Sequence, residues 1–218
     1  MTLLELSNIS YIVKDKSIIR NVSLSVNHGD YITIVGPSGS GKSTLLKLCS
    51  DLISPTSGTI TYNGRPLTAI DPESYRKEVG YCFQRPYLFA KTVHRNILFP
   101  YDIRGLKPDM SRIEYLFDLL HMPLNYMERR NDELSGGEMQ RICLIRSLIF
   151  EPKVLLLDEV TSALDATNTS IVENVIDELY KKGITIISIT HNEEQSLRTA
   201  NRRITIVDGQ LAKEEVLI

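Results

Sequence analysis

Long apolar runs are missing from this sequence. No stretch approaches the roughly eighteen uninterrupted apolar residues that a membrane-spanning helix requires. The first residues also lack the basic segment and following apolar segment that mark a secretory signal peptide. We therefore expect a chain that stays in the cytosol and does not itself cross a membrane.

An excess of positive charge is missing as well. Lys and Arg number 25 against 27 Asp and Glu, so the formal net charge is −2. Proteins that bind nucleic acid through its phosphates usually present a basic surface. We therefore expect no nucleic-acid partner.

Cysteines are few in this chain. Cys49, Cys82 and Cys143 are odd in number, far apart in the sequence and without a CxxC pair. This pattern argues against a disulfide framework and against a zinc site. We expect three reduced thiols with a structural role.

The length permits one substantial core. Of the 218 residues, 42% are hydrophobic, which is enough for one core or for a core with a smaller appended lobe. We therefore expect a single domain over residues 1–218.

A glycine-rich stretch follows the apolar run Tyr31–Val35, and a helical pattern begins near Gly41. In a loop between strand and helix, backbone N–H groups can close around phosphates, and the positive end of the helix dipole adds to the attraction. Lys42 would then reach the β- and γ-phosphates, and the Ser43 hydroxyl would ligate Mg²⁺. The sequence therefore predicts a nucleotide phosphate site made by Gly36, Pro37, Ser38, Gly39, Ser40, Gly41, Lys42, Ser43 and Thr44.

Strand and helix patterns alternate around this loop. Leu3–Val13 and Val22–Val26 predict an antiparallel hairpin. Further strands are expected at Val79–Phe83, Val154–Leu157, Ile184–Ile189 and Ile204–Val207, and helices at Thr167–Lys182 and Glu193–Ala200.

Residues 85–150 have a different character. They lack a comparable strand pattern but carry helical periodicity, for example at Ile113, Leu116, Phe117 and Leu120, which indicates an α-helical insert. The fold is therefore expected to be α/β with a mainly parallel sheet. Its ligand site should lie at the carboxyl ends of the strands, where Gln84, Asp158 and His191 stand.

Two adjacent acids end the buried strand at 154–157. Asp158 has the hard carboxylate that Mg²⁺ needs, either directly or through water. Glu159 can act as general base or orient the water that attacks the γ-phosphate. The alternative is a solvated strand end without catalytic function.

His191 and Tyr11 have two interpretations each. His191 could contact the γ-phosphate, or it could be a satisfied structural histidine at a strand end. Tyr11 could offer a stacking platform for a base, or it could be an ordinary strand aromatic.

Further motifs identify a family resemblance. The chain carries the phosphate loop, a Q-loop glutamine at Gln84, the signature LSGGE at Leu134–Glu138, the acidic strand end LLLDE at Leu155–Glu159, the sequence SALD at Ser162–Asp165 and a histidine at 191. In this order they resemble ATP-binding cassette (ABC) proteins over nearly the whole chain.

The resemblance implies a P-loop NTPase fold with ATP and Mg²⁺ as cofactors. It implies a RecA-like core plus an N-terminal antiparallel β subdomain in residues 1–84 and 151–218, and the helical insert with the signature in 85–150. It further implies that Tyr11 stacks on adenine, that Gln84 senses Mg²⁺ and the membrane partner, and that Asp165 acts across a dimer interface.

Three positions depart from the family pattern. Glu138 stands where glutamine is more common, Val160 where proline usually follows the catalytic glutamate, and Asn192 where aspartate is common after the histidine. None of these changes removes a group with an assigned catalytic role.

The signature also has a physical interpretation of its own. Ser135 can cap the helix that it begins, and Gly136 and Gly137 leave backbone N–H groups accessible to an anion. In family members this second phosphate clamp meets the phosphate loop only between facing subunits. The resemblance therefore implies a composite site in a head-to-tail homodimer that forms when ATP binds.

The predicted function is the ATP-hydrolysing subunit of an ABC transporter, held by a separate transmembrane permease at the cytoplasmic face of the inner (plasma) membrane. The stretch after Gln84, from Arg85–Phe89 on through Ile97–Phe99, is apolar and aromatic where the family docks the permease, although these side chains could pack within the insert instead. The alternative is a mechanical ABC protein that acts on DNA or ribosomes. Those proteins usually carry two cassettes or a long coiled coil, and this sequence has neither.

Residues 81–84, 88–89, 92–93 and 99–104 are similar to those of the small FetA/YbbL-type ATPases, which are associated with iron export in bacteria. Because the membrane subunit selects the substrate, no residue of this chain encodes iron chemically. Lipoprotein release and amino acid or phosphate transport therefore remain open.

Overall fold

The computed structural model describes residues 1–192 and 197–217. The chain forms two compact units. The first unit contains Met1–Tyr81, Lys153–Glu159 and Tyr180–Ile218, and the second contains Cys82–Pro152 and Val160–Leu179. None of the described helices is both long and apolar enough to cross a membrane.

An antiparallel sheet of order β2-β1-β4-β5 occupies part of the first unit. Its strands are β1 (Thr2–Val13), β2 (Lys16–Asn27), β4 (Ser57–Tyr62) and β5 (Arg65–Pro66). The expected hairpin is confirmed, but its second strand begins at Lys16 instead of Val22. The turn is shorter than expected because Lys14 and Asp15 both adopt positive φ, the conformation that a two-residue hairpin turn requires.

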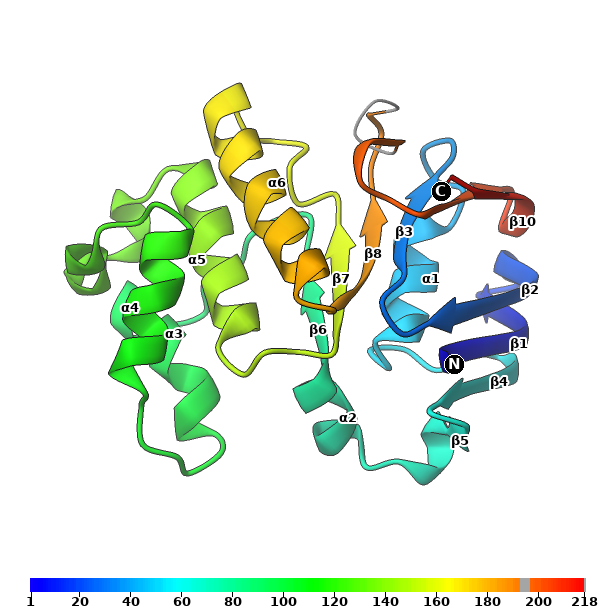
Figure 1. Cartoon of the computed structure of the whole chain (residues 1–218). Coiled ribbons are helices and arrows are strands. Elements are labelled where there is room, and N and C mark those ends of the chain that lie inside the picture. The colour runs from blue at the N-terminus through cyan, green and yellow to red at the C-terminus, as the bar shows by residue number, and fades with distance from the viewer. Residues whose placement is uncertain (193–196, 218) are drawn as a thin grey trace. The chain divides into compact units, whose positions relative to one another are not determined.

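The larger sheet has the order β10-β9-β3-β8-β7-β6. Its strands are β3 (Tyr31–Val35), β6 (Val79–Cys82), β7 (Val154–Asp158), β8 (Thr185–Ile189), β9 (Arg202–Val207) and β10 (Gln210–Val216). Strands β9, β3, β8 and β7 pair in parallel, and β10 is paired antiparallel to its neighbour β9. Figure 1 shows β3, β8 and β7 side by side with their arrows in one direction. The expected mainly parallel sheet is confirmed, and the carboxyl ends of these strands share one edge.

The first unit also contains two short α-helices. α1 (Lys42–Cys49) follows the glycine loop and buries Leu45, Leu46 and Leu48 in the core. α2 (Pro72–Glu78) begins at the N-cap Asp71, whose carboxylate accepts a hydrogen bond from Ser74 N at 2.8 Å. The 3-10 helix η1 (Leu67–Ala69) precedes α2.

The second unit is helical. It contains α3 (Val93–Asp102), α4 (Met110–Leu119), α5 (Gly136–Leu148) and most of α6 (Ala166–Lys181), with the 3-10 helices η2 (Leu124–Glu128) and η3 (Asn131–Glu133). The apolar residues of the expected helical stripe, Ile113, Leu116, Phe117 and Leu120, are all buried. The interpretation of residues 85–150 as helical is confirmed.

The three cysteines are free and buried, as expected. Burial raises the pKa of the Cys49 and Cys82 thiols to about 12, which keeps them protonated and unreactive. The helix expected at Glu193–Ala200 lies partly at residues 193–196, outside the described residues.

Candidate functional site

The glycine loop between β3 and α1 has a backbone that only glycine allows at two points. Gly36 has φ 139°, and a Cβ there would meet the carbonyl oxygen of Ile206 at 2.0 Å. Gly41, the N-cap of α1, has φ 101°, and a Cβ there would meet the carbonyl oxygen of Ile18 at 2.8 Å. Larger residues would therefore force the loop apart at both ends.

Lys42 turns its ammonium group into this loop. Its Nζ donates to the carbonyl oxygens of Gly36 and Pro37, at 2.9 Å each. Burial lowers the pKa of Lys42 from its ordinary 10.5, and the charges of Glu159 and Asp158 partly offset this effect. A cation held between backbone oxygens at a helix start is well placed to exchange those partners for phosphate oxygens.

Ser40 carries an orphaned polar atom in the same loop. Its Oγ is buried and has no hydrogen-bond partner among the described residues. A buried hydroxyl without a partner is costly unless another group satisfies it. A phosphate oxygen in the glycine loop would be such a group, so the loop fits a nucleotide phosphate.

Asp158 ends β7 with both carboxylate oxygens engaged. Ser43 Oγ, on α1, donates to Oδ1 at 2.8 Å, and the Tyr81 hydroxyl, on β6, donates to Oδ2 at 2.7 Å. Hydroxyl and carboxylate oxygens are the hard ligands that Mg²⁺ prefers, so the Ser43 hydroxyl and the Asp158 carboxylate fit Mg²⁺ bound with a nucleotide. The contact of Tyr81 was not expected, although the residue stands three positions before Gln84.

Glu159 and His191 lie against each other. The distance from His191 Nε2 to Glu159 Oε1 is 2.7 Å, and the two residues follow the neighbouring strands β7 and β8. The Glu159 side chain is 12% exposed and that of His191 is 49% exposed, so the pair connects a shielded carboxylate to solvent. Glu159 also adopts φ 49°, a left-handed conformation that costs free energy in a residue with a Cβ.

Tyr11 is partly buried and packs against the core of the first unit. It pairs with Ile19 of β2 near the hairpin turn. This position is compatible with both interpretations of the residue, and its stacking on adenine stays a prediction.

The signature forms the start of α5 in the second unit. Ser135 is the N-cap, as expected, and its Oγ accepts from Glu138 N at 3.3 Å while Glu138 Oε2 accepts from Ser135 N at 2.7 Å. This reciprocal capping box holds the two signature glycines, 136 and 137, at the first turn of the helix.

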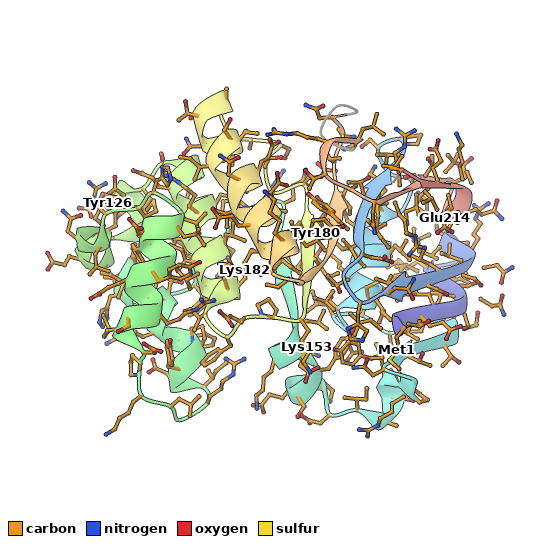
Figure 2. All side chains as sticks on the ribbon, viewed as in Figure 1. Met1, Tyr126, Lys153, Tyr180, Lys182 and Glu214 are labelled. Carbon is orange, nitrogen blue, oxygen red and sulfur yellow. The ribbon has the colours of Figure 1, made fainter. Side chains whose placement is uncertain are left out.

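Glu138 has partners that the sequence pattern did not indicate. The hydroxyl of Tyr126, labelled in Figure 2, donates to Glu138 Oε1 at 2.6 Å, and Arg129 lies 3.9 Å from the same oxygen. Burial by itself would raise the pKa of Glu138, but the hydrogen bonds from Tyr126 and Ser135 and the charge of Arg129 outweigh it. The pKa therefore lies below the ordinary 4.5.

This pKa shift predicts acid sensitivity at the signature. Because the folded pKa is depressed, Glu138 contributes stability above about pH 4.5 that is lost as the pH falls through the folded pKa. Glu138→Gln keeps a side chain able to complete the capping box but cannot titrate. We expect the melting temperature of the wild type to fall more steeply between pH 6 and pH 3 than that of Glu138→Gln.

The matched control for this prediction is Glu114→Gln, at an exposed position of α4 in the same unit. It should follow the wild-type curve. Equal pH dependence in the wild type and Glu138→Gln would contradict a stabilising charge at residue 138.

Asp165 caps a helix. Its Oδ1 and Oδ2 accept from the backbone N and the side-chain Nδ2 of Asn168, at 2.8 and 2.7 Å, at the start of α6. The first of these hydrogen bonds is the main reason that the pKa of Asp165 is lowered. Its role across a dimer interface stays a prediction.

The structure brings together Lys42, Ser43, Asp158, Glu159 and His191 within the first unit. Of the other expected site residues, Tyr11 and the rest of the phosphate loop also belong to the first unit, whereas the second unit contains Gln84, Ser135, Gly136, Gly137 and Asp165. Gln84 is exposed, and its part in binding Mg²⁺ stays a prediction.

Comparison with known proteins gives consistent matches. A family model described as "ABC transporter" matches residues 19–162. The chain is 43% identical to "Probable iron export ATP-binding protein FetA" of Escherichia coli (strain K12), over 94% of this chain and 91% of that protein. It is 39% identical to "Lipoprotein-releasing system ATP-binding protein LolD 1" of Chlorobium chlorochromatii (strain CaD3), over 93% and 85%.

A solved structure also matches over nearly its full length. It is the dimeric, post-hydrolysis structure of an ATP-binding cassette bound to ADP and Pi, with a TM-score of 0.89, 26% identity and 99% of both chains covered. Together with the family model, which spans more than half of the sequence, these matches show that the chain belongs to the ABC transporter family, as one of its ATP-hydrolysing subunits.

Proposed function

We propose that this chain binds ATP with Mg²⁺ at the carboxyl edge of the larger sheet and hydrolyses it with Glu159 as general base. The observation that carries the proposal is the convergence of the Lys42 ammonium, the Ser43–Asp158 pair and the Glu159–His191 pair on that edge. Ser43 and Asp158 would hold Mg²⁺, which when bound neutralises charge on the β- and γ-phosphate oxygens.

The proposed reaction is a single displacement at the γ-phosphorus. Glu159 accepts a proton as the oxygen of water forms a bond to the γ-phosphorus, and the bond between that phosphorus and the β–γ bridging oxygen breaks. His191, at 2.7 Å from Glu159, holds the carboxylate in place and can contact the γ-phosphate. Lys42 stabilises the phosphates throughout.

We further infer that the site is completed by a second copy of the chain. Ser135 and Gly136 are exposed at the start of α5, so both are accessible to a partner's phosphates. The structural relative bound to ADP and Pi is itself dimeric, which supports pairing of two cassettes. The two compact units would then act as parts of one ABC ATPase domain, with a core in 1–84 and 151–218 and the helical insert in 85–150.

The permease would dock on the second unit. The exposed large apolar residues there include Tyr87, Phe89, Phe99, Ile103 and Leu106, so part of each side chain is accessible to a partner. The rings of Phe89 and Phe99 lie 4.3 Å apart, and the guanidinium of Arg146 lies 5.0 Å from the Phe89 ring. Ile97, by contrast, is fully buried, so the expected docking segment is divided between core and surface. Docking would place the chain at the cytoplasmic face of the inner (plasma) membrane.

Iron export is the transport function that the relatives favour. The relative described as a probable iron export protein is 43% identical, while relatives described as lipoprotein-releasing and phosphate import proteins are 39% and 33% identical. Co-purification of the chain with a permease, followed by transport assays with that complex, would identify the cargo.

The Lys42→Ala variant tests the nucleotide site. A hydrogen bond to a charged group contributes roughly 1.5–3 kcal/mol, so ATP should bind about 10- to 100-fold more weakly. Calorimetry with Mg-ATP measures the affinity, and Lys47→Ala, in the last turn of α1, is the matched control that should bind as the wild type does. Unchanged affinity in Lys42→Ala would overturn the assignment of the loop.

A further inference from the structure

The Asp158 carboxylate is held from two different elements. It is buried, at 4% exposure, and its two oxygens accept separately from Ser43 Oγ and from the Tyr81 hydroxyl. Ser43 belongs to α1, whereas Tyr81 belongs to β6, the neighbour of β7 in the sheet. A carboxylate with a single donor can turn about its last torsion, but two donors on opposite oxygens fix its plane.

These two hydrogen bonds leave part of the acceptor capacity of Asp158 for a metal. An ionised carboxylate offers about four acceptor positions, and Ser43 and Tyr81 use one on each oxygen. A position on each oxygen is therefore free to approach Mg²⁺ or one of its water ligands. The direction of those remaining lone pairs is set by the hydroxyl of Tyr81 as much as by that of Ser43.

Tyr81 also stands at a particular point in the chain. It is the last residue of the first unit before the chain enters the second unit, and Gln84 follows three residues later. Its hydroxyl therefore anchors the end of β6 to Asp158 immediately before the expected Q-loop.

We propose that Tyr81 is a positioning residue for the metal site: its hydroxyl orients the Asp158 carboxylate for Mg²⁺, and it sets the affinity of the ATP-loaded protein for the divalent cation. The inference rests on the proposed function, because it assumes that Asp158 serves Mg²⁺ bound with ATP. Partners that orient metal-binding groups through hydrogen bonds typically change metal affinity by about 10- to 100-fold when they are removed.

The first unit offers a matched control. Tyr62 donates to Glu78 Oε2 at 2.7 Å, a tyrosine–carboxylate hydrogen bond of the same length as that of Tyr81, and neither partner belongs to the nucleotide site. Tyr62→Phe and Tyr81→Phe thus remove equivalent hydroxyls, one away from the metal site and one beside it. Any difference in metal affinity between the two variants reports on position and not on the general loss of a hydrogen bond.

The experiment uses the full chain and Mn²⁺ as a spectroscopic probe. Binding of Mn²⁺ to the ATP-loaded protein is titrated by electron paramagnetic resonance, and binding of ATP alone is measured by calorimetry in excess EDTA. We expect Tyr81→Phe to bind Mn²⁺ at least about tenfold more weakly than the wild type, with metal-free ATP affinity within about twofold. Tyr62→Phe should match the wild type in both titrations.

The outcomes separate the inference from the function on which it rests. Wild-type Mn²⁺ affinity in Tyr81→Phe, or an equal loss in Tyr62→Phe, would overturn the positioning role while leaving the ATPase site intact. An equal loss of metal-free ATP affinity would also overturn it, because the hydroxyl would then maintain the whole loop. If the wild type itself shows no ATP-dependent Mn²⁺ binding, the proposed nucleotide–metal site fails instead.

Discussion

The Glu159→Gln variant is expected to hydrolyse ATP about 10²- to 10⁴-fold more slowly than the wild type, the range attributed to general-base catalysis. Glutamine keeps the size of the side chain and can still hydrogen-bond to His191, which lies 2.7 Å from Glu159 in the wild type. It cannot accept the proton of the attacking water. Single-turnover hydrolysis measures the loss, and Glu73→Gln, at the exposed start of α2, should hydrolyse ATP at the wild-type rate.

The same variant should accumulate as an ATP-bound dimer. In the proposed dimer, opening would follow loss of the γ-phosphate, which the variant would remove slowly, and the neutral side chain would also reduce repulsion of that phosphate. Size-exclusion chromatography in Mg-ATP should show a dimer for Glu159→Gln and mostly monomer for the isolated wild type. A Glu159→Gln protein that remains monomeric at saturating ATP would count against pairing around the nucleotide.

The Ser135→Arg variant is expected to eliminate turnover while ATP still binds to the monomer with nearly wild-type affinity. The signature would serve the nucleotide of the partner chain, so a bulky cation at residue 135 would disrupt the partner's site while every residue of the phosphate loop in its own chain is unchanged. Steady-state hydrolysis and calorimetry measure the two effects separately. Combined with Glu159→Gln, the substitution should also prevent the ATP-bound dimer.

A control must separate this effect from the loss of a helix cap. Ser135 caps α5, and removing such a cap costs about 1 kcal/mol. Asp109→Arg removes the cap of α4 in the same unit, where Asp109 accepts from Arg112 N at 3.0 Å, and should retain turnover.

Mixing two variants with defects in different motifs gives a second test of the composite site. In a head-to-tail pair of Ser135→Arg with Lys42→Ala, one of the two sites has both an intact loop and an intact signature. The mixture should therefore turn over ATP faster than either variant does alone. Normal hydrolysis by Ser135→Arg, or no recovery on mixing, would contradict a site shared by two chains.

Much of the fold was predictable because its signals are local. The apolar run before Asp158 predicts a buried strand, and the structure has the fully buried strand β7 there. The glycine loop leads into α1, as its pattern predicts. Ser135 was predictable as a helix cap from its own neighbours in sequence, and the structure confirms it with a capping box to Glu138.

The contacts that escaped prediction join residues that are distant in sequence. Tyr81 reaches Asp158 only because β6 neighbours β7 in the sheet, and no local pattern reveals which strands are neighbours. Tyr126 reaches Glu138 from a 3-10 helix whose position depends on the packing of the second unit. In both cases a tyrosine hydroxyl holds a carboxylate, and composition alone cannot identify that pairing.

At Glu159, selection for stability and selection for catalysis favour different residues. Its φ of 49° costs a residue with a Cβ free energy of order 1–3 kcal/mol, which glycine would avoid and asparagine would reduce. A cassette that no longer needed the Glu159 carboxylate for turnover would become more stable by exchanging this residue. In homologous chains, glycine or asparagine at this position would therefore indicate a site that still binds nucleotide but no longer hydrolyses it.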